Sequence, residues 1–261
     1  MRFIDRLKYT NKYSRLNSYF LKMLLLLNKQ KLKTGSMTEI CSKYLKIVGL
    51  GSGPSLNLCE LDERNLYLTT NSSYLYLNYK MNFIHFIKDL NYLKKFLLFG
   101  LKYKPKLVVI EIYTHSIGCG LGKLSIEVVE KYFGKRKFDF PVIVTNNENL
   151  FSLNSKNYYN NRIDFIKENQ LNNPDTNSGL MIYGYSVWLT SKIESIKECD
   201  IYGLDAGEGG KKYFNGVNTL PNHVAMRDEN KKHMGSFINE CQNIFSFINN
   251  YSYFQNNKNN I

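Results

Sequence analysis

Cysteine pairs suited to metal binding or disulfide bonding are missing from this sequence. Five cysteines are scattered along the chain, an odd number without C-x-x-C spacing: Cys41, Cys59, Cys119, Cys199 and Cys241. Structural zinc sites and disulfide frameworks require closely or regularly spaced cysteines. The sequence therefore indicates neither, and a reducing, cytoplasmic environment is the simplest expectation.

A hydrophobic run long enough to cross a bilayer is also missing near the N-terminus. The apolar segment at 21–27 is too short to span a membrane. Basic residues flank it at 2–15 and 29–33, and no small-residue cleavage site follows it. A helix packed on the main domain is the simpler interpretation of this region. A basic amphipathic helix lying on an anionic membrane surface is the alternative.

Acidic residues are few relative to basic ones, with 22 Asp and Glu against 35 Lys and Arg and a net charge of +13. A nucleic-acid-binding protein concentrates such charge in a recognisable motif. Here the lysines are spread, without a helix-turn-helix, zinc-finger or ribonucleoprotein pattern, and we expect no nucleic-acid partner. The charge fits a protein that contacts anionic lipid or handles phosphorylated or acidic sugars.

The sequence does show the alternation of predicted strands and helices that is typical of an α/β protein. The 261 residues are 43% hydrophobic and 14% aromatic, which suffices for one large folded domain. Apolar runs predict strands at 45–50, 66–70, 82–87, 106–112, 140–145 and 200–204. Helical periodicity predicts a helix that ends near 101 and helices at 124–133, 178–191 and 228–251, with loops at 146–176 and 206–222.

These elements predict a single doubly wound, mostly parallel α/β sheet of Rossmann-like type, with helices on both faces. Internal repeats and clear interdomain linkers are missing. We divide the chain into a basic N-terminal helical appendage (1–44), a main domain (45–254) and a polar tail (255–261).

A glycine-rich stretch after the first expected strand is the most distinctive local feature. Gly49, Gly51, Gly53 and Pro54 end this strand abruptly, as happens where a ligand approaches the backbone. The dinucleotide fingerprint G-x-G-x-x-G is not met, because Leu56 stands at the third glycine position. A plain strand-to-loop turn is the alternative interpretation.

Other polar segments are expected at the same edge of the sheet, where ligands of such folds bind. They are the strand ends at 70–73 and 205–210 and the helix start at 177–179, which offers backbone N–H groups and a hydroxyl to a phosphate or carboxylate. Together with 51–55 they predict a nucleotide site without a Walker A sequence.

Four motifs resemble, in the same order, the bacterial sialyltransferases of glycosyltransferase family 42. They are Gly51-Ser-Gly-Pro-Ser-Leu56, Asn71, Asn177-Ser-Gly-Leu180 and Ile201-Tyr-Gly-Leu-Asp205. They are similar also to proteins of the motility-accessory and pterin-pyrophosphokinase type. By motif order the resemblance covers 45–250; it is specific only at these four places, and 80–170 aligns with nothing.

The sialyltransferase resemblance implies a GT-A-like variant of the fold and a transferase domain that binds a nucleotide sugar. The implied reaction is metal-independent, inverting transfer of an acidic sugar from a CMP-sugar donor to a glycan acceptor of a bacterial surface polysaccharide or lipooligosaccharide. Beyond that donor substrate, no cofactor and no metal are implied. Peripheral association at the inner face of the inner membrane is expected, and we leave open whether the chain forms a homo-oligomer.

The resemblance also implies the nucleotide-binding residues. Ser52, Gly53 and Asn71 match positions that hold the cytidine nucleotide, and Ser178 and Gly179 match the helix start that contacts it. We add three neighbours in the same motifs, Gly51, Ser55 and Asp205. For Asp205, binding of a ribose or metal and capping of the following glycine-rich turn are left open.

A histidine ahead of the last helix is the catalytic base in that family, and His223 matches it, with Asp228 following. A base of pKa near ~6.5 suits removal of a proton from an acceptor hydroxyl. Tyr213 matches one of two tyrosines that stabilise the leaving phosphate, while Gly207 stands at the other position. Our own inference is that Lys211 and Lys212 supply positive charge there instead.

Two departures from the family pattern concern the sugar. Ser52 replaces an asparagine, and Asp175 stands where the family has an arginine. The donor sugar is therefore expected to be sialic acid or a similar ulosonic acid such as Kdo.

The remaining histidines have other expected roles. His85 lies in an apolar strand and is expected in the core, and His233 lies in a helix-periodic stretch. His115 follows a strand end and is left open as a substrate contact.

Two rival functions are kept. One is an ATP-dependent, pyrophosphokinase-like enzyme that holds Mg²⁺ through Asp205 and Glu208. The other is a non-catalytic nucleotide-binding module on the same fold.

Overall fold

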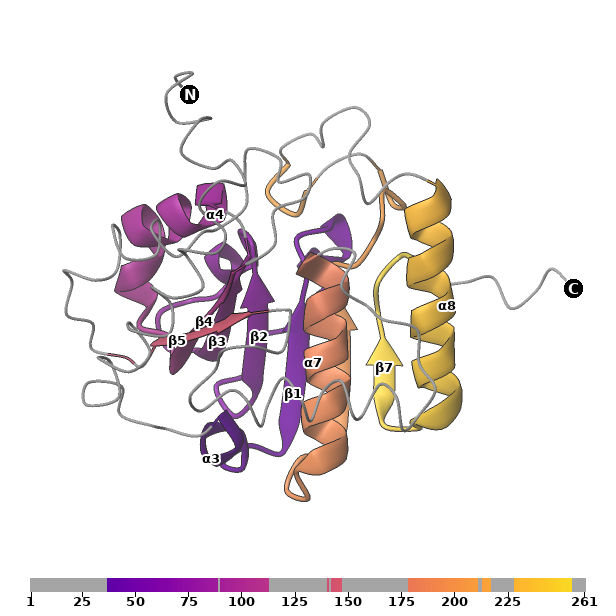
Figure 1. The fold of residues 1–261 in the computed structure, drawn as a ribbon, viewed down its shortest axis with the longest axis horizontal. Helices are drawn as coiled ribbons and strands as arrows, with labels where there is room; N and C mark the ends of the chain where they lie inside the picture. Colours follow the sequence, from indigo (N-terminus) through magenta and orange to yellow (C-terminus); the bar gives the residue numbers. More distant parts are fainter. Residues whose placement is uncertain are drawn as a thin grey trace, which may run out of the picture.

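The computed structural model describes residues 37–88, 90–112, 140, 142–146, 178–210, 213–216 and 228–254 (Figure 1). These residues form an α/β fold around one sheet of seven strands in the order β5-β4-β3-β2-β1-β6-β7. The strands are β1 (Lys46–Leu50), β2 (Leu66–Thr70), β3 (Asn82–Ile87), β4 (Leu107–Ile112), β5 (Val142–Asn146), β6 (Glu198–Tyr202) and β7 (Ile248–Asn250). Every neighbouring pair is parallel.

Helices connect and cover these strands. The α-helices are α3 (Met37–Cys41), α4 (Leu90–Lys95), α7 (Ser178–Lys192) and α8 (Asp228–Ile244). Short helical turns are η3 (Pro54–Leu58), η4 (Ser73–Tyr76), η5 (Phe96–Gly100) and η6 (Leu101–Tyr103). Among the helices of the described residues, none is long and apolar enough to cross a membrane.

The sheet carries a hydrophobic core on each face, because alternate side chains of its strands point to opposite sides. In β1, Ile47 belongs to the first core cluster, together with residues of α3, α7 and α8. Val48 and Leu50 belong to the second cluster, which is covered by η3, η4, α4 and η5. A sheet buried on both faces explains why its strands are almost continuously apolar.

Helix α7 packs across the centre of the sheet against β1, β2 and β6, and it runs beside β1 in Figure 1. Its side chains from Leu180 to Thr190 are all buried, as expected of a helix that is apolar on all sides. Gly49 permits this contact, since a Cβ there would lie 2.7 Å from Ser186 Oγ and 2.8 Å from Ile201 Cδ1.

The order of the strands creates a reversal beside β1. The chain places β2, β3, β4 and β5 successively to one side of β1, and α7 then leads back to β6 on the other side. The loops after β1 and β6 therefore leave the carboxyl edge of the sheet next to each other, at the point where the strand order reverses. In open α/β sheets, ligands bind at such a point.

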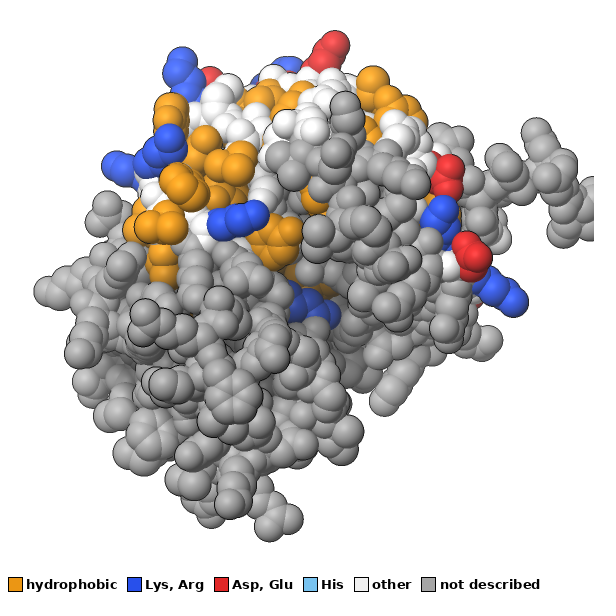
Figure 2. Space-filling model, turned by 90° about the horizontal axis from the view of Figure 1, so that it is seen from above, with side chains coloured by type: hydrophobic (Ala, Val, Ile, Leu, Met, Phe, Trp, Pro, Cys, Tyr) orange, Lys and Arg blue, Asp and Glu red, His pale blue; other side chains and the backbone are white. Residues whose placement is uncertain are grey.

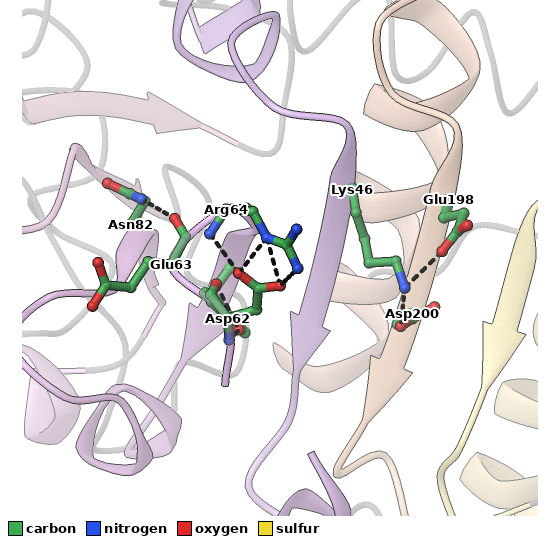
Figure 3. A network of polar contacts seen from close by, with 8 residues as sticks. Lys46, Asp62, Glu63, Arg64, Asn82, Glu198 and Asp200 are labelled. Carbon is green, nitrogen blue, oxygen red and sulfur yellow. Dashed lines mark hydrogen bonds and ion pairs between the residues drawn. The ribbon is translucent and has the colours of Figure 1, made fainter. Parts of the chain in front are cut away.

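The amino edge of the sheet is held by charged contacts (Figure 3). Lys46 Nζ lies 2.6 Å from Glu198 and 2.9 Å from Asp200, which joins β1 to β6. Asn249 donates to the other oxygen of Asp200 at 3.0 Å and so adds β7. These contacts join β1, β6 and β7 near the amino edge of the sheet. The glycine-rich loop lies at the opposite, carboxyl edge.

Most expected strands are confirmed. β2 and β3 have the expected bounds, β1 and β4 begin one residue later, and β5 is displaced toward its C-terminal end. β6 ends at Tyr202 rather than at 204, because Gly203 adopts a left-handed φ of +75°. The expected helix at 124–133 and nearly all of the loop at 146–176 lie outside the described residues.

The expected helix at 228–251 is wrong in its last part. Helix α8 ends at Ile244, and Ile248–Asn250 forms β7, which pairs with β6. An edge strand of three residues with two asparagines carries almost no periodicity of its own, so the helical spacing before it extends over it in the sequence.

The N-terminal boundary stays a prediction. Met37 and Cys41 of α3 are buried in the first core cluster, and residues 1–36 and 255–261 lie outside the described residues.

His85 is in the core, as expected. Its ring is fully buried, stacks on Phe96 with 4.6 Å between ring centroids, and places Nδ1 2.9 Å from Thr69 Oγ1. Within the described chain, Nε2 has no hydrogen-bond partner. Burial lowers the pKa of His85 to about 3, so the imidazole is buried in its neutral form.

The free energy of unfolding should consequently fall in mild acid. Since the folded pKa lies below the unfolded value, stability from this group is complete above about pH 6.5 and declines by up to about 1.4 kcal/mol per pH unit toward pH 3. Urea unfolding at pH 7.5 and 5.0 should show a smaller loss for His85→Gln than for the wild type. Equal losses would show that this imidazole is not buried in its neutral form.

Candidate functional site

The glycine-rich loop lies against the turn that follows β6. Gly51 donates its N–H to the Tyr202 carbonyl at 2.8 Å, and Gly53 donates to the Gly203 carbonyl at 2.9 Å. A Cβ at Gly51 would overlap the Gly203 carbonyl oxygen, and one at Gly203 would lie 2.6 Å from the Gly51 oxygen. Two glycines are thus required because one backbone passes directly over the other.

A buried carboxylate holds this contact together. Asp205 is 2% exposed, and it accepts the Ser55 hydroxyl at 2.6 Å, the Ser55 N–H at 2.8 Å and the Tyr253 N–H at 2.7 Å. The Ser55 hydroxyl oxygen in turn accepts the Gly203 N–H at 2.8 Å. A Cβ at Gly53 would fall on the Asp205 carboxylate. One side chain therefore fastens the loop after β1, the turn after β6 and the segment after β7.

The role of Asp205 follows from these bonds. Burial raises the pKa of its carboxyl, and the hydrogen bonds from Ser55 and Tyr253 oppose that effect. Its oxygens are directed at protein donors, which favours a positioning role over contact with a ligand. Neither of the two interpretations left open for Asp205 describes these bonds: among the described residues, the carboxylate accepts from the loop after β1 and the segment after β7, and not from the glycine-rich turn that follows it.

The end of β2 is tied to the end of β1. Ser73 Oγ accepts the Thr70 N–H at 3.0 Å and lies 2.8 Å from the carbonyl oxygens of both Leu50 and Thr70. Asn71, which lies between Thr70 and Ser73 in the sequence, adopts φ +55°. Asparagine tolerates this left-handed conformation better than most residues. Asn71 thus lies at the same edge of the sheet as the glycine-rich loop.

The segment 213–216 packs onto the glycine-rich loop from far along the chain. Phe214 donates its N–H to the Ser52 carbonyl at 3.1 Å, and the Phe214 carbonyl accepts from Asn57 Nδ2 at 3.1 Å. Tyr213, the predicted phosphate contact, is therefore next in sequence to a residue bound to Ser52. Tyr213 is half-buried, and burial raises the pKa of its phenol.

Two buried hydroxyls at this edge have no hydrogen-bond partner within the described residues. They are Ser52 Oγ, in the glycine-rich loop, and Thr70 Oγ1, at the end of β2. A buried polar group without a partner costs free energy, so such groups call for an explanation. Ser52 was among the predicted binding residues and Thr70 was not; its place directly before Asn71 was the available signal.

The start of α7 belongs to the same edge. Because α7 leads into the first residue of β6, its N-terminus lies near the carboxyl ends of the strands, as Figure 1 shows. Ser178 and Gly179 form its first turn and are half-buried. The free N–H groups of a helix start favour an anion.

The structure thus brings eight predicted residues to the carboxyl edge. They are Gly51, Ser52, Gly53, Ser55, Asn71, Ser178, Gly179 and Asp205, with Tyr213 packed beside them. The predicted base His223 and the lysines Lys211 and Lys212 lie outside the described residues, as do His115 and Asp175.

The acidic residues near this edge are engaged with protein. Glu208 Oε1 lies 2.8 Å from Lys231 Nζ, which connects the turn after β6 to α8. Within the described part of the chain, no group of three or more His, Cys, Asp or Glu side chains is arranged to hold a metal ion.

Comparison of the sequence and structure with protein-family models, curated proteins and solved structures finds no match.

Removing the Asp205 carboxylate should destabilise the protein strongly. Asp205→Ala leaves three donors without an acceptor, two of them buried, and we expect a loss of about 3 kcal/mol or more in the free energy of unfolding, measured with urea. The matched control is Glu208→Gln, which removes only a surface ion pair and should cost at most about 1 kcal/mol. If both variants were equally stable, Asp205 would not be the residue that fastens the loop.

Proposed function

We propose that this chain is a glycosyltransferase that moves an acidic sugar from a CMP-sugar to a glycan acceptor. One observation carries the proposal. The segments that resemble family 42 sialyltransferases, although far apart in sequence, converge at the carboxyl edge of β1 and β2 and the start of α7. Convergence is what a shared site requires.

The proposal includes a finer description of the fold. The sheet is of the doubly wound, Rossmann-like type in a GT-A-like variant, with the donor at the carboxyl edge of the sheet, beside the ends of β1 and β2. The order of strands around β1 supports this.

The nucleotide would contact backbone and neutral side chains. The hydroxyls of Ser52 and Thr70 are buried and have no hydrogen-bond partner among the described residues. Asn71, Ser178 and Gly179 add an amide, a hydroxyl and the helix start. Gly51 and Ser55 shape the loop, and Asp205 positions it. Such groups suit the ribose and phosphate of CMP.

The chemical step is an inverting displacement. The acceptor hydroxyl oxygen attacks the anomeric carbon, the bond from that carbon to the phosphate oxygen breaks, and CMP leaves with the electron pair. His223 takes the proton of the acceptor hydroxyl. Lys211 and Lys212 offset the charge on the phosphate. Because burial raises the pKa of Tyr213, its phenol stays protonated at neutral pH and can donate a hydrogen bond there.

The metal-dependent rival is less well supported. A pyrophosphokinase-like site would use Asp205 and Glu208 as Mg²⁺ ligands. The Asp205 oxygens accept three hydrogen bonds from protein, and Glu208 pairs with Lys231. Recruiting both would require breaking these contacts, whereas the transferase uses them as they stand.

The proposed working location is the inner face of a bacterial inner membrane, where lipid-linked glycan acceptors are assembled. The net charge of +13 supports this location, because the lipids of that membrane surface are anionic.

Release of CMP from CMP-sialic acid or CMP-Kdo, with a mixture of glycan acceptors, tests the proposal. We expect turnover that persists in EDTA. His223→Ala should lower kcat by about 100-fold or more, as for loss of a general base. Tyr213→Phe should lower kcat by about tenfold, the cost of one hydrogen bond of about 1.4 kcal/mol to the leaving phosphate.

Two matched controls accompany these variants. His233→Gln removes a histidine within α8 and should leave kcat unchanged. Ser52→Ala should raise KM for the donor. Ser195→Ala should not, although it removes another buried hydroxyl that has no partner among the described residues, at the opposite edge before β6. Turnover only with ATP and Mg²⁺ would contradict the proposal, and full activity in His223→Ala would remove the assigned base.

A further inference from the structure

An exposed apolar surface lies on the layer that covers the second core cluster. The helical segment from α4 through η6 buries Leu93, Phe96 and Leu97 against the sheet. On its outer side, the adjacent residues Leu98 and Phe99 are 74% and 55% exposed. Two large apolar side chains therefore face solvent together, on a segment whose inner side is already packed. Single exposed apolar residues are common, whereas a contiguous pair calls for an explanation.

Two lysines flank this pair along the helical segment, and two tyrosines lie close to one of them. Lys102 Nζ lies 5.6 Å from the centroid of the Tyr79 ring and 5.5 Å from that of Tyr103, and the two rings stack with 5.0 Å between centroids. Lys95 precedes the apolar pair by about one helical turn, and Lys102 follows it by about one turn. We name this set the lysine–aromatic surface: Tyr79, Lys95, Leu98, Phe99 and Lys102. Figure 2 shows hydrophobic and basic side chains gathered together on this part of the molecule.

The charge of this region is predominantly positive. Residues 73–106 contain seven lysines and a single acidic residue, Asp89. Glu63, from outside them, pairs with Lys80 at 3.9 Å, and Lys80 is therefore not counted in the lysine–aromatic surface. The complement of such a surface is an anionic layer that also accepts apolar side chains.

We propose that the lysine–aromatic surface docks the protein onto a membrane that contains anionic phospholipids. Leu98 and Phe99 enter the interfacial region, and the ammonium groups of Lys95 and Lys102 contact headgroup phosphates while their stems lie along apolar surface. Tyrosine suits this depth because its ring is apolar and its hydroxyl is polar. A protein partner would need a pocket for the protruding pair, whereas a bilayer accepts it without one. The proposal is independent of the catalytic chemistry and of the N-terminal residues 1–36.

Sedimentation of the full chain with vesicles tests this docking. We expect binding to phosphatidylcholine vesicles that contain phosphatidylglycerol and little binding to phosphatidylcholine alone. Lys95→Glu with Lys102→Glu should weaken the partition coefficient by at least about tenfold, and high salt should reproduce this loss. Leu98→Ser with Phe99→Ser should weaken binding by about tenfold at low and high salt alike.

The control is Lys43→Glu with Leu45→Ser, which makes the same kinds of change at an exposed lysine and at a leucine that is 70% exposed near the amino edge. It should stay within about twofold of the wild type, since its charge lies away from the proposed contact. All changed side chains are exposed, and circular dichroism will verify folding. If the control and the surface variants lost vesicle binding equally, the proposal would be overturned, because binding would then depend on the net charge of the protein and not on this surface. Absence of binding to anionic vesicles, or loss of self-association instead of vesicle binding, would overturn it as well.

Discussion

The hydrogen bonds of the Asp205 carboxylate are the contacts on which the carboxyl edge of the sheet depends. They hold the Ser55 backbone and hydroxyl and the Tyr253 backbone at 2.6–2.8 Å, in a site that is almost fully buried. With the loop held there, the backbone at Gly51 passes over Gly203 at a distance that only glycines permit. The glycine-rich sequence is thus first a consequence of packing.

This arrangement divides the residues of the carboxyl edge into those that hold the loops in place and those that could bind a ligand. Asp205 is hydrogen-bonded to Ser55, and Glu208 forms an ion pair with Lys231. The hydroxyls of Ser52 and Thr70 are buried without partners among the described residues. A site with neutral donors and a helix start, rather than with free carboxylates, suits a phosphate-bearing ligand held without a metal. The proposed transfer from a CMP-sugar follows from that chemistry together with the sequence resemblance.

Much of the sheet could be predicted from sequence, because a strand buried on both faces is an apolar run that polar turns interrupt. β2 and β3 match for this reason. β7 could not be found, since Ile248–Asn250 is short, lies at an edge and follows a strongly periodic helix. The role of Asp205 was left open by the sequence and is decided by its burial and partners. The contact between Phe214 and Ser52 could not be read from spacing, because it depends on how the loops fold back across the edge.

Hydrogen exchange with and without CMP, followed by mass spectrometry, tests the central claim most directly because it locates the bound nucleotide. The account predicts that CMP, in the presence of EDTA, slows amide exchange in peptides that cover 50–56 and 70–73 and at the start of α7. Peptides at 193–198 and 95–103 should be unchanged. Protection that appears only with ATP and Mg²⁺, or that lies away from the carboxyl edge of β1 and β2, would contradict it.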